Sequence, residues 1–317
     1  MTSGSPASRT DLAGFLAGRV STDVCAILVR FAEASATLRD ALAVAPLSGM
    51  LGKTGDTNVQ GESTAKLDER ANDIFCDALR LPSVARIISE EEAEVVEVGD
   101  GPYTLAFDPL DGSSNIGYSS VGSILGIYEG IRGDAFTGGA VTGRLLVASA
   151  FTVYGLPTML VVAAGGEVAS FAFEPDERAW LLAAERLSVP EAAYTSINWT
   201  YHDRWPAHVQ QAVQAASDGL RGRYSGSMVE DILRVLLAGG VFMYPEDSSS
   251  PQGKLRMLYE VGPIGFVMET AGGGASDGAG SVLDVPITAP HQRGPFIAGS
   301  AEAVARYEAA YAEGRPD

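Results

Sequence analysis

The stretch at residues 107–115, FDPLDGSSN, contains the densest group of side chains that could do chemistry. Asp108 and Asp111 lie three residues apart and offer hard oxygen ligands for a divalent cation. Gly112 lets the backbone approach a ligand closely, and Ser113 and Ser114 add N–H and hydroxyl donors for an anion. A cation site beside an anion site is typical of metal-assisted phosphate chemistry. The same residue types also favour an ordinary acidic β-turn, so both interpretations stay open here.

Two strands are expected to deliver these carboxylates to one edge of a sheet. Alternation over residues 103–107 predicts a strand that ends before Pro109, because proline lacks an N–H and fixes its own φ. Residues 84–88 predict a second strand, which runs directly into the glutamates at 90–92. A charge run is usually a solvated face. If the two strands are neighbours, however, four carboxylates converge at the end where open α/β sheets place their sites.

Helices and further strands are expected on either side of this pair. Residues 21–44 carry apolar side chains at helical spacing, and Pro46 is expected to end that helix. Residues 121–173 are rich in β signals and predict several strands, partly antiparallel. A helical stripe over residues 227–237 stops at a glycine pair.

A helix expected over residues 64–79 carries two polar side chains, Asp68 and Asn72, one turn apart. Taken alone, Asp68 is explained equally well as a solvated helix residue.

The segment at 254–260, KLRMLYE, is open between two conformations. An extended chain places Lys254 and Arg256 on one face, whereas a helix makes Arg256 and Glu260 an i, i+4 pair.

Composition excludes several classes of protein. The chain has 317 residues, of which 46% are hydrophobic, and a net charge of −18, which argues against nucleic acid or an anionic membrane as partner. No apolar run is long enough to span a membrane, and the N-terminus lacks the apolar core of a secretory signal, so a cytoplasmic protein is expected. The two cysteines and three histidines show no zinc-binding spacing. An anionic substrate would need a local basic cluster, although lysine occurs only three times.

Several motifs together resemble the class I fructose-1,6-bisphosphatase family. FDPLDGSSN is preceded by ISEEE and followed by VGSILGIY. The core of that motif is shared with inositol monophosphatases, but the C-terminal half narrows the resemblance. TSINWTYHDRW, RYSGSMVEDILRVLLAGGVFMYP, GKLRMLYE and AGGGASDG match the bisphosphatase pattern in order and spacing. The resemblance covers roughly residues 20–312.

The resemblance implies an α/β (α+β) layered sugar-phosphatase fold, with two mixed β-sheets between layers of helices. Residues 1–20 are then a tail and the start of the first helix. Residues 21–188 form a metal-binding domain, and residues 189–317 form a sugar-phosphate-binding domain. The family also implies a homotetramer.

The resemblance further implies a role for each matched residue. Two or three Mg²⁺ ions, with Mn²⁺ as the alternative, are expected on the carboxylates and one backbone carbonyl of Glu90, Glu91, Asp108, Leu110, Asp111 and Glu260. Asp68 helps to activate the attacking water, and Glu91 acts as the base. The phosphate that leaves is bound by the segment Asp111, Gly112, Ser113 and Ser114. The sugar and its second phosphate are bound by Asn198, Tyr201, Tyr224, Tyr244 and Lys254, and Arg223 reaches into the site of a neighbouring subunit.

The implied reaction is hydrolysis of the 1-phosphate of D-fructose 1,6-bisphosphate, in gluconeogenesis or the Calvin cycle. The family's AMP-binding residues are missing, since Pro102 replaces a lysine and Glu129 an arginine, and little inhibition by AMP is expected. Sedoheptulose 1,7-bisphosphate is an alternative or additional substrate. An inactive sugar-phosphate-binding protein is the alternative from another class; it would have lost a metal carboxylate, and every matched position is filled.

Overall fold

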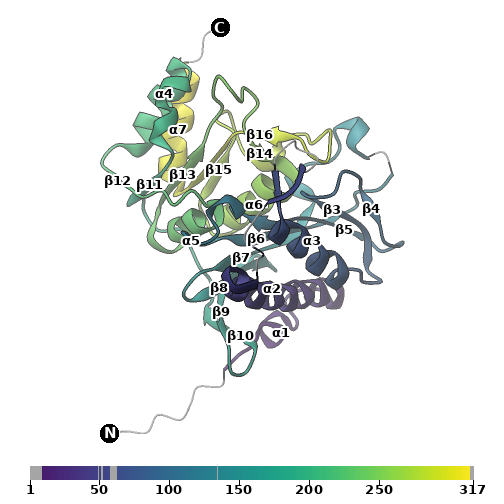
Figure 1. Ribbon diagram of the computed structural model, residues 1–317. Helices are drawn as coiled ribbons and strands as arrows, with labels where there is room; N and C mark the ends of the chain where they lie inside the picture. The colour runs from purple at the N-terminus through teal and green to yellow at the C-terminus, as the bar shows by residue number, and fades with distance from the viewer. Residues whose placement is uncertain (1–8, 49, 51–52, 58–62, 134, 315–317) are drawn as a thin grey trace, which may run out of the picture.

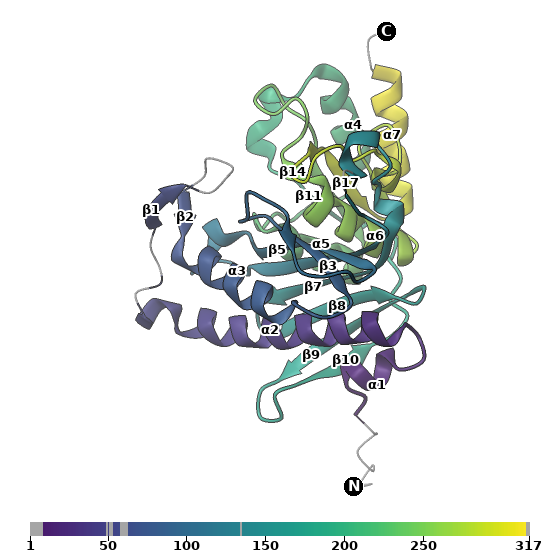
Figure 2. The ribbon, with the colours of Figure 1, turned by 90° about the vertical axis from the view of Figure 1, so that its right-hand side faces the viewer.

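The computed structural model describes residues 9–48, 50, 53–57, 63–133 and 135–314. They form five alternating layers, in which two mixed sheets separate three layers of helices (Figures 1 and 2). Beside the two large sheets lie two short antiparallel pairs, β1 (Lys53–Thr57) with β2 (Ser63–Ala65) and β14 (Leu255–Arg256) with β16 (Arg293–Gly294).

The first sheet has eight strands, in the order β10 (Ala179–Ala184), β9 (Glu167–Glu174), β8 (Thr158–Ala164), β7 (Leu146–Tyr154), β6 (Gly122–Glu129), β5 (Tyr103–Asp111), β3 (Val84–Ser89) and β4 (Val96–Glu97). The pair β3–β5 is parallel, and the other neighbours are antiparallel. The central strands are buried along nearly their whole length because helices cover both faces, which is why their sequences are almost continuously apolar. The expected antiparallel run over 121–173 is confirmed.

Helices α1 (Leu12–Leu16), α2 (Thr22–Ser48) and α3 (Lys66–Ala78) cover the outer face of this sheet. Phe75 packs there between Phe31, stacked at a centroid distance of 5.1 Å, and Phe107, tilted at 5.8 Å. Helices α5 (Met228–Ala238) and α6 (Gly262–Thr270) fill the space between the two sheets. This arrangement confirms the expected fold of two mixed sheets between helical layers.

The second sheet has five strands, in the order β12 (Arg221–Gly222), β11 (Tyr194–Ser196), β13 (Gly240–Tyr244), β17 (Phe296–Gly299) and β15 (Gly274–Ser276). Helices α4 (Ala207–Ser217) and α7 (Ala301–Gly314) pack on its outer face and bury Val213 and Tyr307 (Figure 1). None of the helices in the described ranges is both long and apolar enough to cross a membrane.

Two proline-based expectations are wrong. Helix α2 runs past Pro46 to Ser48, because a proline in an exposed last turn removes only one helical hydrogen bond. Strand β5 runs through Pro109 to Asp111, because a bulge takes up the extra residue: Asp108 pairs with Ile124, and Asp111 already pairs with Gly122.

Near the N-terminus, the part of residues 1–20 that is described contains a separate short helix, α1, whose Leu12, Phe15 and Leu16 are buried. Residues 1–8 lie outside the described ranges. The segment 254–260 combines both conformations left open, since the short strand β14 leads into a π-helical turn, η5 (Met257–Val261).

Candidate active site

A cavity of about 540 Å³ lies where β3 and β5 end, between the two halves of the chain. It is lined from the first half by Asp68 on α3, the turn after β3, and the segment that ends β5 and continues into the 3₁₀ turn η1 (Ser113–Asn115). From the second half it is lined by the N-terminus of α5, by β13 and by the segment that leads into η5. All but one of the site residues expected from the sequence line it: Asp68, Glu90, Glu91, Asp108, Leu110, Asp111, Gly112, Ser113, Ser114, Asn198, Tyr201, Tyr224, Tyr244, Lys254 and Glu260.

Three buried carboxylates form the centre of the cavity. One oxygen each of Asp108, Asp111 and Glu260 lies within 4.8 Å of the others, and all three side chains are at most 7% exposed. Burial first, and then the neighbouring carboxylates, hold the pKa of Asp108 and of Glu260 well above the ordinary values. Burial raises the pKa of Asp111 to about 7. The protein therefore holds together negative charges that repel one another.

Backbone N–H groups fix the direction of each of these carboxylates. The bulge at Pro109 turns the N–H of Leu110 back to Asp108 Oδ1, at 2.9 Å. The N–H of Val229, in the first turn of α5, donates to Asp111 Oδ2 at 3.1 Å. The N–H of Arg256 donates to Glu260 Oε2 at 2.6 Å across the π-helical turn. The i, i+4 relation of Arg256 and Glu260 is thus a backbone contact; the guanidinium group lies near Glu90, with Nη2 3.7 Å from Oε1.

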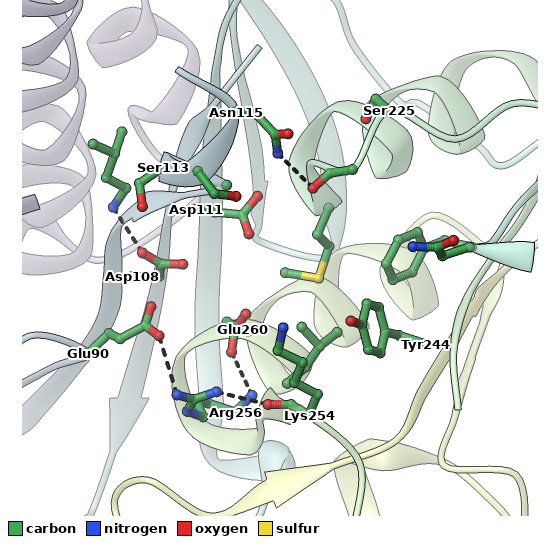
Figure 3. Close-up of a pocket in the computed structure, with 18 of the residues that line it drawn as sticks. Glu90, Asp108, Asp111, Ser113, Asn115, Ser225, Tyr244, Lys254, Arg256 and Glu260 are labelled. Carbon is green, nitrogen blue, oxygen red and sulfur yellow. Dashed lines mark hydrogen bonds and ion pairs between the residues drawn. The ribbon is translucent and has the colours of Figure 1, made fainter. Parts of the chain in front are cut away.

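The chemistry of this donor set suits a hard divalent cation. Uncompensated buried carboxylates at this spacing are costly, and an ion that accepts oxygen ligands removes that cost. Strand β3 runs parallel to β5 and leads into Glu90 and Glu91, which therefore line the cavity at the same edge. The expected convergence of two acidic strand ends is confirmed. Figure 3 shows Glu90, Asp108, Asp111 and Glu260 around one space.

Lys254 and Tyr244 lie across the cavity from Glu90 and Asp108, whereas Arg256 lies beside Glu90 (Figure 3). Lys254 and Arg256 are the basic residues among those that line it. Tyr201 and Tyr244 meet edge to face, with centroids 6.5 Å apart. Burial raises the pKa of Tyr244, so its phenol remains a protonated donor near neutral pH. Such a wall can bind the hydroxyls and the charge of a polar ligand.

The backbone turn that follows β5 also lines the cavity. Gly112 adopts φ +76°, a left-handed conformation that favours glycine, and a Cβ there would lie 3.2 Å from Ser227. This turn places Ser113 and Ser114 at the cavity surface. Asn115 Nδ2 donates to the carbonyl of Gly226 at 2.8 Å and so ties the turn to the second half of the chain.

Arg223 is the expected site residue that this cavity does not include. Its side chain is exposed, lies over the ring of Tyr194 at 5.9 Å and donates to the carbonyl of Gly222. The expected basic cluster is therefore reduced within one chain to Lys254 and Arg256. A reach of Arg223 into a neighbouring subunit stays a prediction.

Sequence reasoning assigned no role to several residues that the structure brings to the cavity, namely Ser225, Gly226, Met228, Phe242 and Leu255. They come from a loop, from the start of α5 and from two strands, without a local charge pattern. The available signal was position alone, since Ser225 and Gly226 directly precede the expected helix over 227–237 and Met228 lies in its first turn.

The family relationship follows from comparison with known proteins. The model described as "Fructose-1-6-bisphosphatase, N-terminal domain" matches residues 16–185, and its C-terminal counterpart matches residues 189–312. The class 1 fructose-1,6-bisphosphatase of Trichormus variabilis is 39% identical over 300 residues, covering 90% of this chain and 86% of that protein. The enzyme of Alkalilimnicola ehrlichii is 36% identical, with 96% and 99% covered.

Solved structures agree with the sequence relatives. The crystal structure of Leishmania major fructose-1,6-bisphosphatase in holo form superposes with a TM-score of 0.90 at 31% identity, covering 96% of this chain and 99% of that one. The T-state structure of the same protein gives a TM-score of 0.86. With both halves matched and a cavity of clustered carboxylates at their junction, the chain belongs to the class 1 fructose-1,6-bisphosphatase family and is a phosphoric monoester hydrolase.

Proposed function

We propose that the chain hydrolyses the 1-phosphate of D-fructose 1,6-bisphosphate, giving D-fructose 6-phosphate and inorganic phosphate. The observation that carries this proposal is the polarity of the cavity. Buried carboxylates gather at one side, and Lys254 and Tyr244 lie at the other. A sugar with a phosphate at each end fits such a division, since one phosphate needs a metal site and the other needs a cation.

Two or three Mg²⁺ ions, or Mn²⁺ in their place, would be held by the carboxylates of Glu90, Glu91, Asp108, Asp111 and Glu260 with the carbonyl of Leu110. When bound, these ions supply Lewis-acid stabilisation of the charge on the phosphate oxygens. The donor set supports this role, because its central members are buried and repel one another until a cation is present.

The chain's own residues orient the reactants. Glu91 takes the proton of the attacking water, and Asp68 holds that water. The water oxygen forms a bond to phosphorus, and the bond from phosphorus to the sugar oxygen breaks. The sugar oxygen takes up a proton in exchange for the one that Glu91 removed and ends as a hydroxyl. Donors from Gly112 to Ser114 hold the reacting phosphate. Binding of the remote phosphate by Lys254 positions the reacting end, which is how distant binding energy assists a chemical step.

We also propose that AMP does not inhibit the enzyme through the family's nucleotide site. Tyr103 and Glu129 are direct partners in the β5–β6 register, so the exposed carboxylate stands at the end of that pair where the family has a basic residue. Pro102, immediately before, supplies neither an N–H nor a charge. An AMP phosphate would meet repulsion at this position instead of an ion pair.

Assembly and pathway complete the proposal. The exposed position of Arg223, away from its own cavity, supports the expectation that it serves a neighbouring subunit in a homotetramer. The reaction would serve gluconeogenesis or the Calvin cycle.

The test is phosphate release, with saturating Mg²⁺, from fructose 1,6-bisphosphate and sedoheptulose 1,7-bisphosphate in parallel, each with and without AMP. We expect turnover of fructose 1,6-bisphosphate that AMP leaves unchanged, and none after chelation. Comparable turnover of both sugars would add a second activity and favour the Calvin cycle. Inhibition by AMP would refute the loss of the nucleotide site, and no release from fructose 1,6-bisphosphate would refute the proposed reaction.

A further inference from the structure

The third glutamate of the run at 90–92 has no place in the proposed reaction. Glu90 and Glu91 line the cavity, whereas Glu92 does not. Its carboxylate instead accepts a hydrogen bond from α3: Asn72 Nδ2 donates to Glu92 Oε1 at 2.8 Å. Asn72 is 8% exposed and Glu92 is half-buried, so the amide side of this bond is shielded from water. A contact between a buried amide and a glutamate next to the proposed base calls for an explanation.

Both ends of the Asn72 amide are engaged, which fixes its orientation. Its Oδ1 accepts a hydrogen bond from Ser89 Oγ at 2.7 Å and a weaker one from Cys76 Sγ at 3.6 Å. Ser89 is fully buried at the end of β3, and its Oγ in turn accepts the N–H of Glu91 at 3.3 Å. The Asn72 amide therefore binds the acidic turn at two residues: Ser89, just before the glutamates that line the cavity, and Glu92, just after them.

The position of Asn72 on α3 relates these hydrogen bonds to the reaction. Asp68 lies one helical turn earlier on the same helix and lines the cavity. The groups proposed to hold and deprotonate the water, Asp68 and Glu91, thus come from separate elements, α3 and the turn after β3. The Asn72 amide joins those elements over 17 to 20 residues of sequence.

We propose that Asn72 and Glu92 are positioning residues, which together set the distance between Asp68 and the Glu90–Glu91 pair. This inference rests on the proposed roles of Asp68 and Glu91. Neither Asn72 nor Glu92 touches the substrate. Displacements of about 1 Å at a reacting centre are enough to lower turnover strongly, so a fixed link between α3 and the turn has direct value for the chemical step.

The test uses the isosteric variant Asn72→Asp. Its carboxylate can still accept the hydrogen bond from Ser89, but it replaces the N–H that faces Glu92 with a charged oxygen. We expect kcat to fall about 10- to 100-fold, as for other residues that orient metal ligands, with KM for fructose 1,6-bisphosphate nearly unchanged. The second variant is Asn72→Asp with Glu92→Gln, in which the new amide donates to the new carboxylate. This reversed pair should restore most of the lost kcat.

Two controls isolate the effect. Arg70→Gln, at an exposed position of α3, changes the net charge of the helix by the same amount as Asn72→Asp and should leave kcat unchanged. Glu92→Gln alone keeps an acceptor for Asn72 and measures how much of any change in the double variant comes from the lost charge of Glu92. Thermal melting of each variant is recorded beside the kinetics.

The outcomes separate the possibilities. A parental kcat in Asn72→Asp would overturn the inference. So would a double variant as slow as the single one, since the amide would then be a packing element without a positioning role. A rise in KM without a fall in kcat would assign Asn72 to substrate binding instead. If the unmodified protein failed to hydrolyse fructose 1,6-bisphosphate, the proposed function itself would be refuted. That result is distinct from a failure of the inference about Asn72, because it is obtained without any variant.

Discussion

Replacing Asp111 with asparagine should abolish turnover and at the same time stabilise the metal-free protein. Both effects have one cause, because the site concentrates negative charge that only a bound cation offsets. Asp111 is 7% exposed, shares the buried cluster with Asp108 and Glu260, and accepts the N–H of Val229. An asparagine keeps the shape and that acceptor, while it removes the charge and a metal ligand.

The size of the stabilisation follows from the pKa. Burial raises the pKa of Asp111 from 3.8 to about 7, so the folded state binds its proton more tightly than the unfolded state does. Stability is therefore lost as pH rises above 3.8, and the loss levels off above pH 7. With about 1.4 kcal/mol for each pKa unit, the cost is on the order of 4 kcal/mol at pH 8 and on the order of 2 kcal/mol at pH 5. Asp111→Asn does not have this cost, because the asparagine side chain carries no charge.

The assay is thermal unfolding in EDTA at pH 8 and pH 5, followed by phosphate release with Mg²⁺. At about 2 °C or less per kcal/mol for a chain of this size, the variant should melt several degrees higher at pH 8 and show a smaller gain at pH 5. Saturating Mg²⁺ should raise the melting temperature of the unmodified protein more than that of the variant.

The matched control is Asp231→Asn. Asp231 is also buried but is paired with Arg234, with 2.5 Å between Oδ1 and Nη1, and it accepts the N–H of Ser225. The same substitution removes one of the two carboxylates that face the half-buried Arg234, leaves Glu230 as the other, and should lower stability. Equal melting of Asp111→Asn and the unmodified protein in EDTA at pH 8, or normal turnover of that variant, would refute the account of the metal site.

Two further predictions concern the turn after β5 and the neighbouring subunit. Gly112→Ala should lose about 1–2 kcal/mol of stability because of its positive φ, and should also lose turnover because the new Cβ presses on Ser227. Gly117→Ala is the control: its φ is +96°, and nothing lies within 4 Å of the new Cβ. Melting and turnover measurements should show only the stability loss for that variant. Arg223→Ala should raise KM. Mixing it with Asp111→Asn subunits should recover about a quarter of normal activity, because half of the randomly formed dimers then hold one complete site out of two. No recovery after subunit exchange would show that Arg223 acts within its own chain.

The layers of the fold could be predicted where the pattern of burial is local. The strands over 121–173 and the helix over 227–237 carry their own periodicity, and the structure confirms them. The errors occurred at Pro46 and Pro109, where sequence rules treat proline as a stop. Pro46 is tolerated because it lies in an exposed last turn of α2, and Pro109 because it lies in a bulge of β5 opposite β6. Neither circumstance can be recognised from the neighbouring residues in the sequence.

The acidic half of the site was predictable for a similar reason. Asp108 and Asp111 follow directly from one strand, and the run at 90–92 follows from another, so the adjacency of β3 and β5 was enough to bring them together. The contacts that hold these groups in place were not predictable. Asn115 meets Gly226, and Val229 meets Asp111, across more than 100 residues of chain. Long-range contacts of this kind depend on how the second sheet packs against α5.

The charge of the cavity shows what one chain does not supply by itself. Six carboxylates line it, against Lys254 and Arg256, and Arg256 already lies beside Glu90. A sugar bisphosphate would enter with further negative charge, so within a single chain the Coulomb energy opposes binding. Metal ions can offset the repulsion at the end with the carboxylates, but they do not reach the remote phosphate. Lys254 is the lining cation proposed to bind that phosphate, and one lysine offsets little of the charge. The proposed reach of the exposed Arg223 into a neighbouring subunit would add a second cation, so we expect activity to depend on assembly.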